Sequence, residues 1–454
     1  MTDRPLFRPA LLAAACLLAM PALSAGYGLL EGLQLARAYD AQYQAATAER
    51  EAGEANGPMG RAQLLPTVNA SFNRSKVTGS DTAPDFTGAI STSPLNYMSQ
   101  DAAIQLRQPL FNLQRWALYQ QGLARVDYSH ALFARKENEL VLRYLSAYLG
   151  VLLSQKNLAL SEAKLHALQA ARTQAQKLFD QGDGTVTDIH DAEARMAMAE
   201  AELLEARSMQ QIAERTLQTT TGQRSSELAE PQEDIGRYLG PEGELAQWRD
   251  KALASSPDIQ AAQQNLRIAE QELKRSRAGN YPTLDLVASK DRSSASSVST
   301  INQRISQNVI GVEVSLPLFN GGYNTAQLAQ SAALYRQAQA ELDNARAQVE
   351  LEVSRQYFGV STGARKVASL QKAVFSSAET VKASKLGLVA GVKTLTDILN
   401  SEEQLYQARR DLLLAQYNQL VSWIALRAAS GAIEQTDLAL LDRHFQSGKR
   451  QSSP

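Results

Sequence analysis

The clearest chemical pattern in this chain is the motif Thr-x-x-Asp, which occurs at residues 185–188 and again at residues 394–397. A hydroxyl followed three residues later by a carboxylate is typical of a capping box, in which both side chains accept hydrogen bonds from free N–H groups at a helix start. The two motifs therefore predict two helix starts. They also place two acidic side chains, Asp188 and Asp397, at equivalent points of the chain.

The other reactive residue types are too scattered to form a catalytic or metal-binding group. The four histidines are far apart in the sequence, and the single cysteine, Cys16, has no second thiol to pair with. Neither a G-x-S-x-G motif nor a phosphate-binding loop occurs. The net charge of −1, evenly mixed, gives no argument for a nucleic-acid partner. We therefore expect no enzyme, no cofactor and no metal.

Residues 1–25 are typical of a signal peptide. An apolar run at 10–20 follows two arginines, and cleavage after Ser24 fits as well as cleavage after Ala25. Cys16 lies inside the apolar run, so we interpret it as part of the signal core rather than as a lipid anchor. No other stretch reaches the roughly 18 apolar residues of a spanning helix. We expect an exported chain that enters a membrane only with strands.

Long helices must position the two motifs. Residues 112–180 contain no proline and carry apolar side chains at four-residue spacing, which predicts a helix about 100 Å long. Gly182 and Gly184 then supply backbone freedom for a turn, and a return helix follows at 187–221. That helix and a first helix at 30–60 together span about 98 Å. We therefore expect these two to stack end to end along the long helix.

Between the first helix and the long helix, the apolar period changes to alternation. Apolar and polar residues alternate at 67–74 and at 101–108, which predicts two strands, each with one apolar face. The intervening stretch at 75–99 is rich in Ser, Thr, Pro and Gly. We expect it to be the loop of a hairpin.

The same order of elements occurs twice. Phe111 and Phe319 are 208 residues apart, and Asp188 and Asp397 are 209 residues apart. After the signal peptide the chain has four expected parts, namely repeat 1 at 26–222, a connector at 223–243, repeat 2 at 244–431 and a C-terminal tail at 432–454. The expected elements of repeat 2 are a helix at 245–278, strands at 283–289 and 307–316, a long helix at 320–386, a turn with Gly391 and a return helix at 394–430.

The apolar face of the four strands has to be covered by other parts of the protein or lie against lipid. In lipid every backbone group must be paired, so only a closed barrel is stable, and four strands are too few to close one. We therefore expect a mainly α fold with a membrane β-barrel portion, to which several copies contribute their hairpins. The alternative is an antiparallel sheet packed against helices in a soluble protein. That alternative gives the export signal, the duplication and the long helices no common cause.

Three features of the sequence point to a known family. The first is Pro-Leu-Phe at the strand ends, at 109–111 and 317–319. The second is the pair of turns at 179–190 and 387–400, and the third is the duplication across both repeats. Together they resemble the TolC family of bacterial outer-membrane channel-tunnel proteins over residues 29–440. Within that family, residues 310–319 and 400–412 are most similar to the branch that serves type I protein secretion.

The resemblance implies an outer-membrane homotrimer with a twelve-stranded barrel, four strands from each chain, and coiled coils that extend into the periplasm. It also implies a periplasmic membrane-fusion adaptor and an inner-membrane ABC transporter as partners, with an unfolded protein as the exported substrate. Two alternatives stay open. One is the outer-membrane channel of a small-molecule efflux pump, and the other is a periplasmic coiled-coil adaptor or scaffold.

In the resembled family, the positions that match Asp188, Lys393 and Asp397 lie at a closed periplasmic aperture, where carboxylate rings pair with a basic residue across chains. Copies of Asp397 near one axis would attract cations and repel one another, and any raised pKa of these carboxyl groups would come from that repulsion. The sequence departs from the family with Lys393 in place of an arginine, Leu388 in place of a tyrosine and Asn400 in place of a second carboxylate. We therefore expect a more weakly latched aperture.

The turns themselves are a candidate contact for the adaptor. Val186 and Leu395 are aliphatic residues directly beside them, next to the turn glycines Gly182, Gly184 and Gly391. An adaptor hairpin would pack against such side chains. A place in the coiled-coil core fits the two residues equally well.

Overall fold

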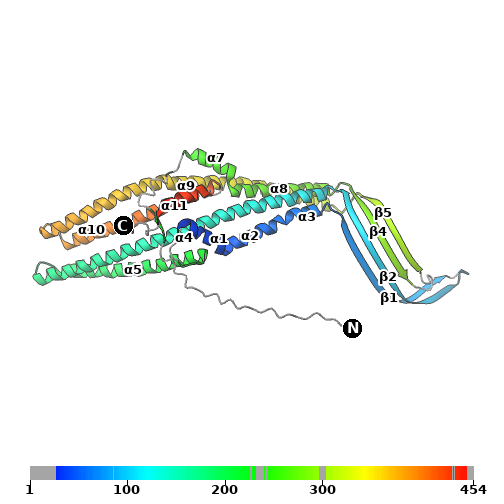
Figure 1. Ribbon diagram of the computed structural model, residues 1–454, viewed down its shortest axis with the longest axis horizontal. Helices are drawn as coiled ribbons and strands as arrows, with labels where there is room; N and C mark the ends of the chain where they lie inside the picture. The colour runs from blue at the N-terminus through cyan, green and yellow to red at the C-terminus, as the bar shows by residue number, and fades with distance from the viewer. Residues whose placement is uncertain are drawn as a thin grey trace, which may run out of the picture.

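A computed structural model of the chain describes residues 27–84, 86–224, 228–231, 240, 243–295, 303–431, 433 and 435–446. The expected signal peptide at 1–25 lies outside the described residues. Figure 1 shows an elongated bundle of long helices with one sheet at its end. None of the helices in the described ranges is long and apolar enough to cross a membrane.

The first helix of repeat 1 is broken, whereas the sequence predicted one helix at 30–60. It consists of α1 (Leu29–Tyr39), α2 (Ala41–Glu54) and α3 (Asn56–Ala62). Asp40 has an extended backbone, and its side chain accepts a hydrogen bond from the N–H of Tyr43 at 2.8 Å. An aspartate that caps the following turn competes with a continuous helix, so the chain bends at this residue.

The long helix α4 (Leu113–Gln181) is followed by α5 (Val186–Thr221). Gly182 ends α4 with a left-handed backbone at φ 85°, a conformation that glycine adopts without strain. Both α5 and the pair α2 and α3 pack along α4, as Figure 1 shows. Five buried residues of α5 recur at intervals of three, seven, four and three residues, which is typical of the seam of a coiled coil: Ile189, Ala192, Ala199, Leu203 and Ala206.

Repeat 2 has the same arrangement, with α7 (Leu245–Ser255), α8 (Pro257–Ala278), α9 (Tyr323–Val389) and α10 (Leu395–Ala429). The prediction of one helix at 245–278 was wrong. Proline cannot continue a helix and disfavours the helical conformation of the residue before it, so Ser256 is extended and Pro257 begins a new helix. This signal is present in the sequence.

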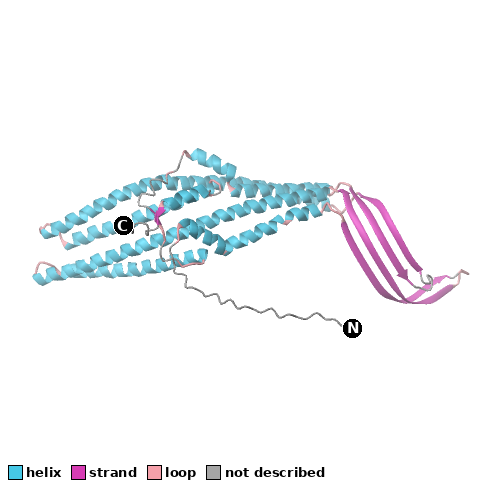
Figure 2. Cartoon of the chain, viewed as in Figure 1, coloured by secondary structure: helices cyan, strands magenta, loops and turns pink. Residues whose placement is uncertain are grey.

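The sheet joins the two repeats. Its strands are β1 (Thr67–Pro84), β2 (Ile90–Phe111), β4 (Thr283–Ala295) and β5 (Gln303–Ser315), antiparallel in the order β1-β2-β4-β5. Each repeat thus contributes one hairpin, and β2 pairs with β4 between the repeats. Figure 2 shows these strands at one end of the helices. The expected duplicated unit of coiled-coil helices plus one hairpin is confirmed.

The strands are longer than predicted, and the expected loop at 75–99 was wrong. The ladder between β1 and β2 continues to Pro84 opposite Ile90. Ladder hydrogen bonds are made by the backbone, so a run of Ser and Thr extends a strand without an apolar pattern. The hydroxyls of Thr82 and Thr92 even pair across the strands, at 2.9 Å.

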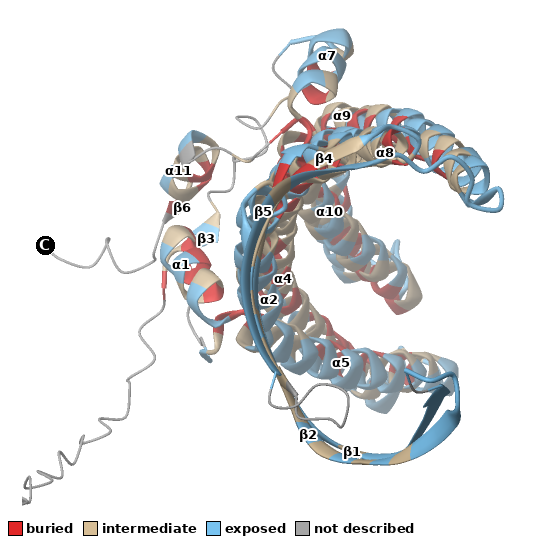
Figure 3. Ribbon diagram, turned by 90° about the vertical axis from the view of Figure 1, so that its right-hand side faces the viewer, coloured by how far each residue is buried: buried red, intermediate tan, exposed pale blue. Residues whose placement is uncertain are grey.

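One face of the sheet is apolar and is not covered by the helices of its own chain. Val68, Leu106, Ala288 and Ile310 lie side by side across the four strands. Val68 is 62 % exposed and Ile310 is 78 % exposed. Figure 3 shows the sheet as an arc, with the helices behind it. This exposed apolar face is what the closure argument requires.

The connector and the tail form a small lobe outside the long helices. In the tail, where no element was predicted, α11 (Gln435–Arg443) precedes β6 (Phe445–Gln446), which pairs with β3 (Glu230–Pro231) of the connector. The main core lies where this lobe meets α4. There Tyr148 donates its hydroxyl hydrogen bond to the carbonyl of Ala229 at 2.9 Å.

Candidate functional site

The two Thr-x-x-Asp motifs form capping boxes at the end of the bundle farthest from the sheet (Figure 1). The hydroxyl of Thr185 accepts a hydrogen bond from the N–H of Asp188 at 3.2 Å, and the carboxylate of Asp188 accepts from the N–H of Thr185 at 3.1 Å. The corresponding distances for Thr394 and Asp397 are 3.2 and 2.9 Å. The two helix starts are therefore built in the same way.

The turn glycines are required by the backbone. Gly182 and Gly391 have φ of 85° and 73°, which a residue with a Cβ adopts only with strain. Gly184 has a different reason, because a Cβ there would lie 2.9 Å from the backbone nitrogen of Phe179. These residues shape the turns and contribute no functional group.

Within a single chain the pKa of Asp397 is held below its usual value. The hydrogen bond from the N–H of Thr394 is the main cause, the hydroxyl of Thr394 adds to it, and the charge of nearby Lys393 acts in the same direction. Any raised pKa at a closed aperture would come from other copies of Asp397, which a single chain does not supply.

The structure places the three aperture residues at one end of the molecule but on two different hairpins. Asp188 belongs to the α4–α5 hairpin, whereas Lys393 and Asp397 belong to the α9–α10 hairpin. Figure 1 shows the tips of both hairpins at the same end. In the part of the chain that the structure describes, no ion pair joins Asp188 to Lys393.

The two aliphatic residues beside the turns have different surroundings. Val186 is 49 % exposed, whereas Leu395 is 4 % exposed. Leu395 belongs to an apolar group that we call the tip cluster, made of Leu168, Ala171, Ala175, Ile189, Ala192, Ala199, Leu395 and Leu399. This group draws on both repeats, so it holds the hairpins together. Leu388 is partly buried and packs against the tip cluster.

A buried lysine that the sequence analysis missed also links the hairpins. Lys164 on α4 lies 2.9 Å from a carboxylate oxygen of Glu202 on α5 and 3.0 Å from one of Glu403 on α10. Its side chain is 10 % exposed. Burial lowers the pKa of Lys164, but the hydrogen bonds to both carboxylates outweigh burial and raise it. The available signal was its place in the seam, four residues before Leu168.

A third link lies closer to the tips. Arg195 on α5 donates a hydrogen bond to the side-chain oxygen of Asn400 on α10 at 2.9 Å. The guanidinium of Arg195 also pairs with Asp191 on its own helix at 3.1 Å. Asn400 thus accepts a hydrogen bond between the repeats, although its side chain carries no charge.

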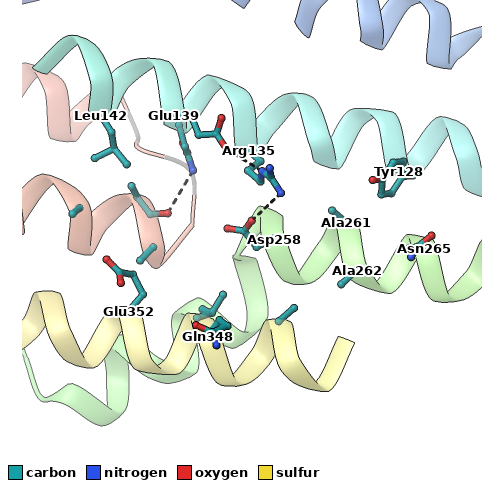
Figure 4. A pocket seen from close by; sticks show the side chains of 16 residues that line it. Tyr128, Arg135, Glu139, Leu142, Asp258, Ala261, Ala262, Asn265, Gln348 and Glu352 are labelled. Atoms are coloured by element: carbon teal, nitrogen blue, oxygen red, sulfur yellow. Dashed lines mark hydrogen bonds and ion pairs between the residues drawn. The ribbon is translucent and has the colours of Figure 1, made fainter. Parts of the chain in front are cut away.

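A cavity of about 600 Å³ lies farther along the bundle, between α4, α8, α9 and α10 (Figure 4). Arg135 on α4 lies 3.7 Å from Asp258 on α8 and 3.1 Å from Glu139 on its own helix. Asn138, from the same face of α4, donates to the carbonyl of Gly431 at 2.9 Å and so satisfies the end of α10. Among the described residues that line the cavity, none is a nucleophile beside a base.

Comparison with known proteins assigns this architecture. The sequence profile of the family described as "Outer membrane efflux protein" matches residues 32–223 and 248–432. The chain belongs to this family. The two matched segments coincide with the two repeats, and the gap between them falls in the connector.

Two curated relatives are similar to this chain over nearly its whole length. The alkaline protease secretion protein AprF of Pseudomonas aeruginosa is 34 % identical, over 93 % of this chain and 88 % of the relative. The proteases secretion protein PrtF of Dickeya chrysanthemi is 33 % identical, over 92 % of this chain and 91 % of the relative.

A solved structure shares the fold. The outer membrane protein VceC of Vibrio cholerae matches with a TM-score of 0.76 at 19 % identity, over 89 % of this chain and 96 % of that one. Together with the family match, this makes the chain a bacterial outer-membrane export channel whose helices extend into the periplasm.

Proposed function

We propose that this outer-membrane channel is a homotrimer that serves as the exit duct of a type I protein secretion system. The observation that carries the trimer is the four-stranded sheet, whose edge strands β1 and β5 have no partner within the described chain and whose apolar face is exposed. Edge strands are a template for pairing with another chain. Three copies would close twelve strands, enough for a barrel with an open interior.

The relatives support protein as the exported substrate. AprF and PrtF are named for protease secretion, and both resemble this chain over about nine-tenths of its length. The duct itself carries out no reaction. A periplasmic adaptor docks on the tips, and an inner-membrane ABC transporter supplies the energy. The family description, "Outer membrane efflux protein", favours small-molecule efflux as the second candidate.

Asp188, Lys393 and Asp397 form the aperture in this proposal. They lie at the periplasmic end of the helices, and the cap fixes the carboxylate of Asp397 at the first turn of α10. Of the two aliphatic residues beside the turns, Val186 and Leu395, only Val186 is exposed and can contact an adaptor. The turn at Gly182 and Gly184 presents Val186, while the turn at Gly391 leads to Leu395, which supports the tip from within.

Cell fractionation tests the duct. We expect the protein in the outer membrane, and we expect an unboiled sample to run in electrophoresis as an oligomer that boiling converts to a monomer. A soluble monomer would contradict the proposal. The exported substrate is tested by expressing the chain with a protease, its adaptor and its ABC transporter in cells that lack their own duct. Extracellular protease supports secretion, and increased drug tolerance without protease supports efflux instead.

The aperture is tested by single-channel conductance. Asp397→Asn removes the charge but keeps an oxygen that can cap the helix, so we expect block by divalent cations to weaken. Thr394→Ala is the matched control, because it removes the cap hydroxyl and leaves the charge. If cation block is the same in Asp397→Asn and in the parent, Asp397 does not line the aperture.

A further inference from the structure

The strands of the sheet separate their charges between its two faces. Even-numbered residues share one face in all four strands, because the register pairs Arg74 with Gln100, Gln100 with Ser294 and Ser294 with Arg304. With the exception of Arg107, every basic residue of β1, β2, β4 and β5 is on that face, and these are Arg74, Lys76, Lys290, Arg292 and Arg304. Every acidic residue is on the other face, and these are Asp81, Asp101, Asp285, Asp291 and Glu313.

The acidic face is internally organised around the one arginine. Arg107 lies 2.7 Å from a carboxylate oxygen of Asp285 and 2.6 Å from one of Glu313. The five basic residues of the opposite face are all exposed, and none of them forms an ion pair within the described ranges. This face therefore carries five positive charges that no described acidic side chain neutralises.

Figure 3 shows the sheet as an arc, and the exposures along its strands assign the basic residues to the outer, convex face. Along β2, the odd-numbered residues Leu95 and Tyr97 are partly covered, whereas the even-numbered Asn96 and Met98 are exposed. The concave side of a curved sheet is the more crowded one, so the even-numbered residues lie on the convex side. The exposed apolar row that includes Val68 is also even-numbered, and it therefore faces the same way.

The basic residues begin where the apolar rows end. From Val68 to Arg74 along β1, and from Leu284 to Lys290 along β4, the outward face advances six residues, or about 20 Å. The helices lie at the Val68 end of the sheet (Figure 1). Because the helices are periplasmic, the basic residues lie toward the opposite surface of the membrane, at the level of the outer-leaflet headgroups.

We propose that these five residues, the outer basic belt, bind the phosphate groups of anionic lipids in the outer leaflet. The inference rests on the membrane barrel of the proposed function. A lipid is the occupant that fits both parts of this face, since its chains cover the apolar rows while its phosphates meet the cations. Arginine binds phosphate through two parallel hydrogen bonds, and the flexible lysines reach past the hydrocarbon edge.

The separation of charges between the two faces makes the outward face favourable for an anionic phosphate. A carboxylate among the five cations would repel a phosphate, and the outward face of the four strands carries none. Lys290 and Arg292 are consecutive outward residues of β4, and Arg304 is on the adjacent strand β5, so three cations gather at one edge of the sheet. In a trimer that edge meets Arg74 and Lys76 on the β1 edge of the next copy.

Binding to defined lipid tests the proposal. The purified oligomer is placed in nanodiscs, and its affinity for lipid A, which carries two phosphates, is compared with its affinity for the same glycolipid after dephosphorylation. We expect the parent to prefer the phosphorylated form, and we expect the preference to shrink as salt rises from 0.05 to 0.5 M. The triple variant Lys290→Gln/Arg292→Gln/Arg304→Gln should bind lipid A at least about tenfold more weakly, since each surface cation contributes about fivefold.

A matched variant controls for the change in net charge. Arg365→Gln/Lys366→Gln/Lys372→Gln removes three exposed cations from α9, far from the sheet, and should leave lipid A affinity within twofold of the parent. Equal affinity of the parent for both glycolipids overturns the belt, as does a triple strand variant that binds like the parent. If that variant does not assemble, the parent's comparison of the two glycolipids decides alone. A parent that forms no heat-modifiable oligomer contradicts the duct instead.

Discussion

The two repeats differ at the point where a return helix meets the bend of the preceding helix pair. In repeat 1 the bend is at Asp40, with φ −61° and ψ 116°, and in repeat 2 it is at Ser256, with φ −61° and ψ 126°. The backbones are thus nearly the same. The side chains opposite them are not, because Arg143 on α4 corresponds to Glu352 on α9, 209 residues later.

In repeat 1 the junction is closed by charge. Asp40 is 5 % exposed, and Arg143 donates to it at 2.6 Å and to Gln42 at 2.7 Å. In repeat 2, no residue that the structure describes pairs with Glu352 across the junction. It accepts bonds from Arg355 and Gln356 of its own helix and lines the cavity of Figure 4.

The difference shows that duplication conserved the backbone and left the junction chemistry free. It also reflects the surroundings, since the cavity in repeat 2 has α4 as its fourth wall. The counterpart of α4 for repeat 1 is α9 of another copy in the proposed trimer. A buried ion pair inside the chain therefore secures the junction that has no fourth wall of its own.

The largest expected effect comes from Arg143→Ala. It leaves the buried carboxylate of Asp40 without its cation, which costs about 3 kcal/mol, the lower end of values for such losses because Arg143 is partly exposed. Hydrogen exchange at the start of α2 should accelerate by about a hundredfold. The equivalent Glu352→Ala in repeat 2 should change exchange at the start of α8 less than twofold. Equal effects at both junctions would remove the distinction.

A smaller effect is expected when the pair of repeat 1 is transplanted. Ser256→Asp together with Glu352→Arg recreates the ion pair at the second junction. Residues in contact couple by about 1 kcal/mol or more, so the double variant should slow exchange at the start of α8 about fivefold beyond the sum of the single variants. Additive effects would mean that the second junction cannot accept the geometry of the first.

Lys164 allows a comparison of the long helices α4 and α9, because the equivalent residue on α9 is Ala373. A lysine with a raised pKa contributes its stability fully below the unfolded value, and the contribution is lost as pH rises through the folded value. We therefore expect exchange in α4 near Lys164 to be steady at neutral pH and to rise in strongly alkaline solution. Lys164→Met should abolish that alkaline step, because it removes the ammonium group and leaves Glu202 and Glu403 partly exposed to solvent. A step that persists in Lys164→Met would come from another group.

The smallest difference is expected between the two caps. Thr185→Ala and Thr394→Ala each remove the same hydrogen bond, with lengths of 3.2 Å in both cases. Each should cost about 1 kcal/mol and speed exchange in the first turn of α5 or α10 about fivefold. A clear inequality between the two would show that the tips differ in support beyond the cap.

The sequence was sufficient for the features that depend on periodicity and composition. The capping boxes, the long helices and the hairpins follow from local patterns, and so does the duplication. The break at Asp40 was missed, because an aspartate inside a helical run does not reveal by itself that its side chain caps the next turn and pairs with the distant Arg143. The long strands of Ser and Thr were missed since backbone pairing needs no apolar alternation. At the tips, the residue types identified the caps, but only packing could show Leu395 as buried and Lys164 as a bridge between hairpins.

The unequal hairpins have a consequence for the outer opening of the duct. Residues 90–98 of β2 continue beyond Ser99, the last residue that pairs with β4, and they remain paired with β1. With three copies around an axis, the rim would carry three tall flaps separated by three lower notches. Anything leaving the cell would then emerge through a crown rather than a smooth ring, with sideways exits close to the cell surface.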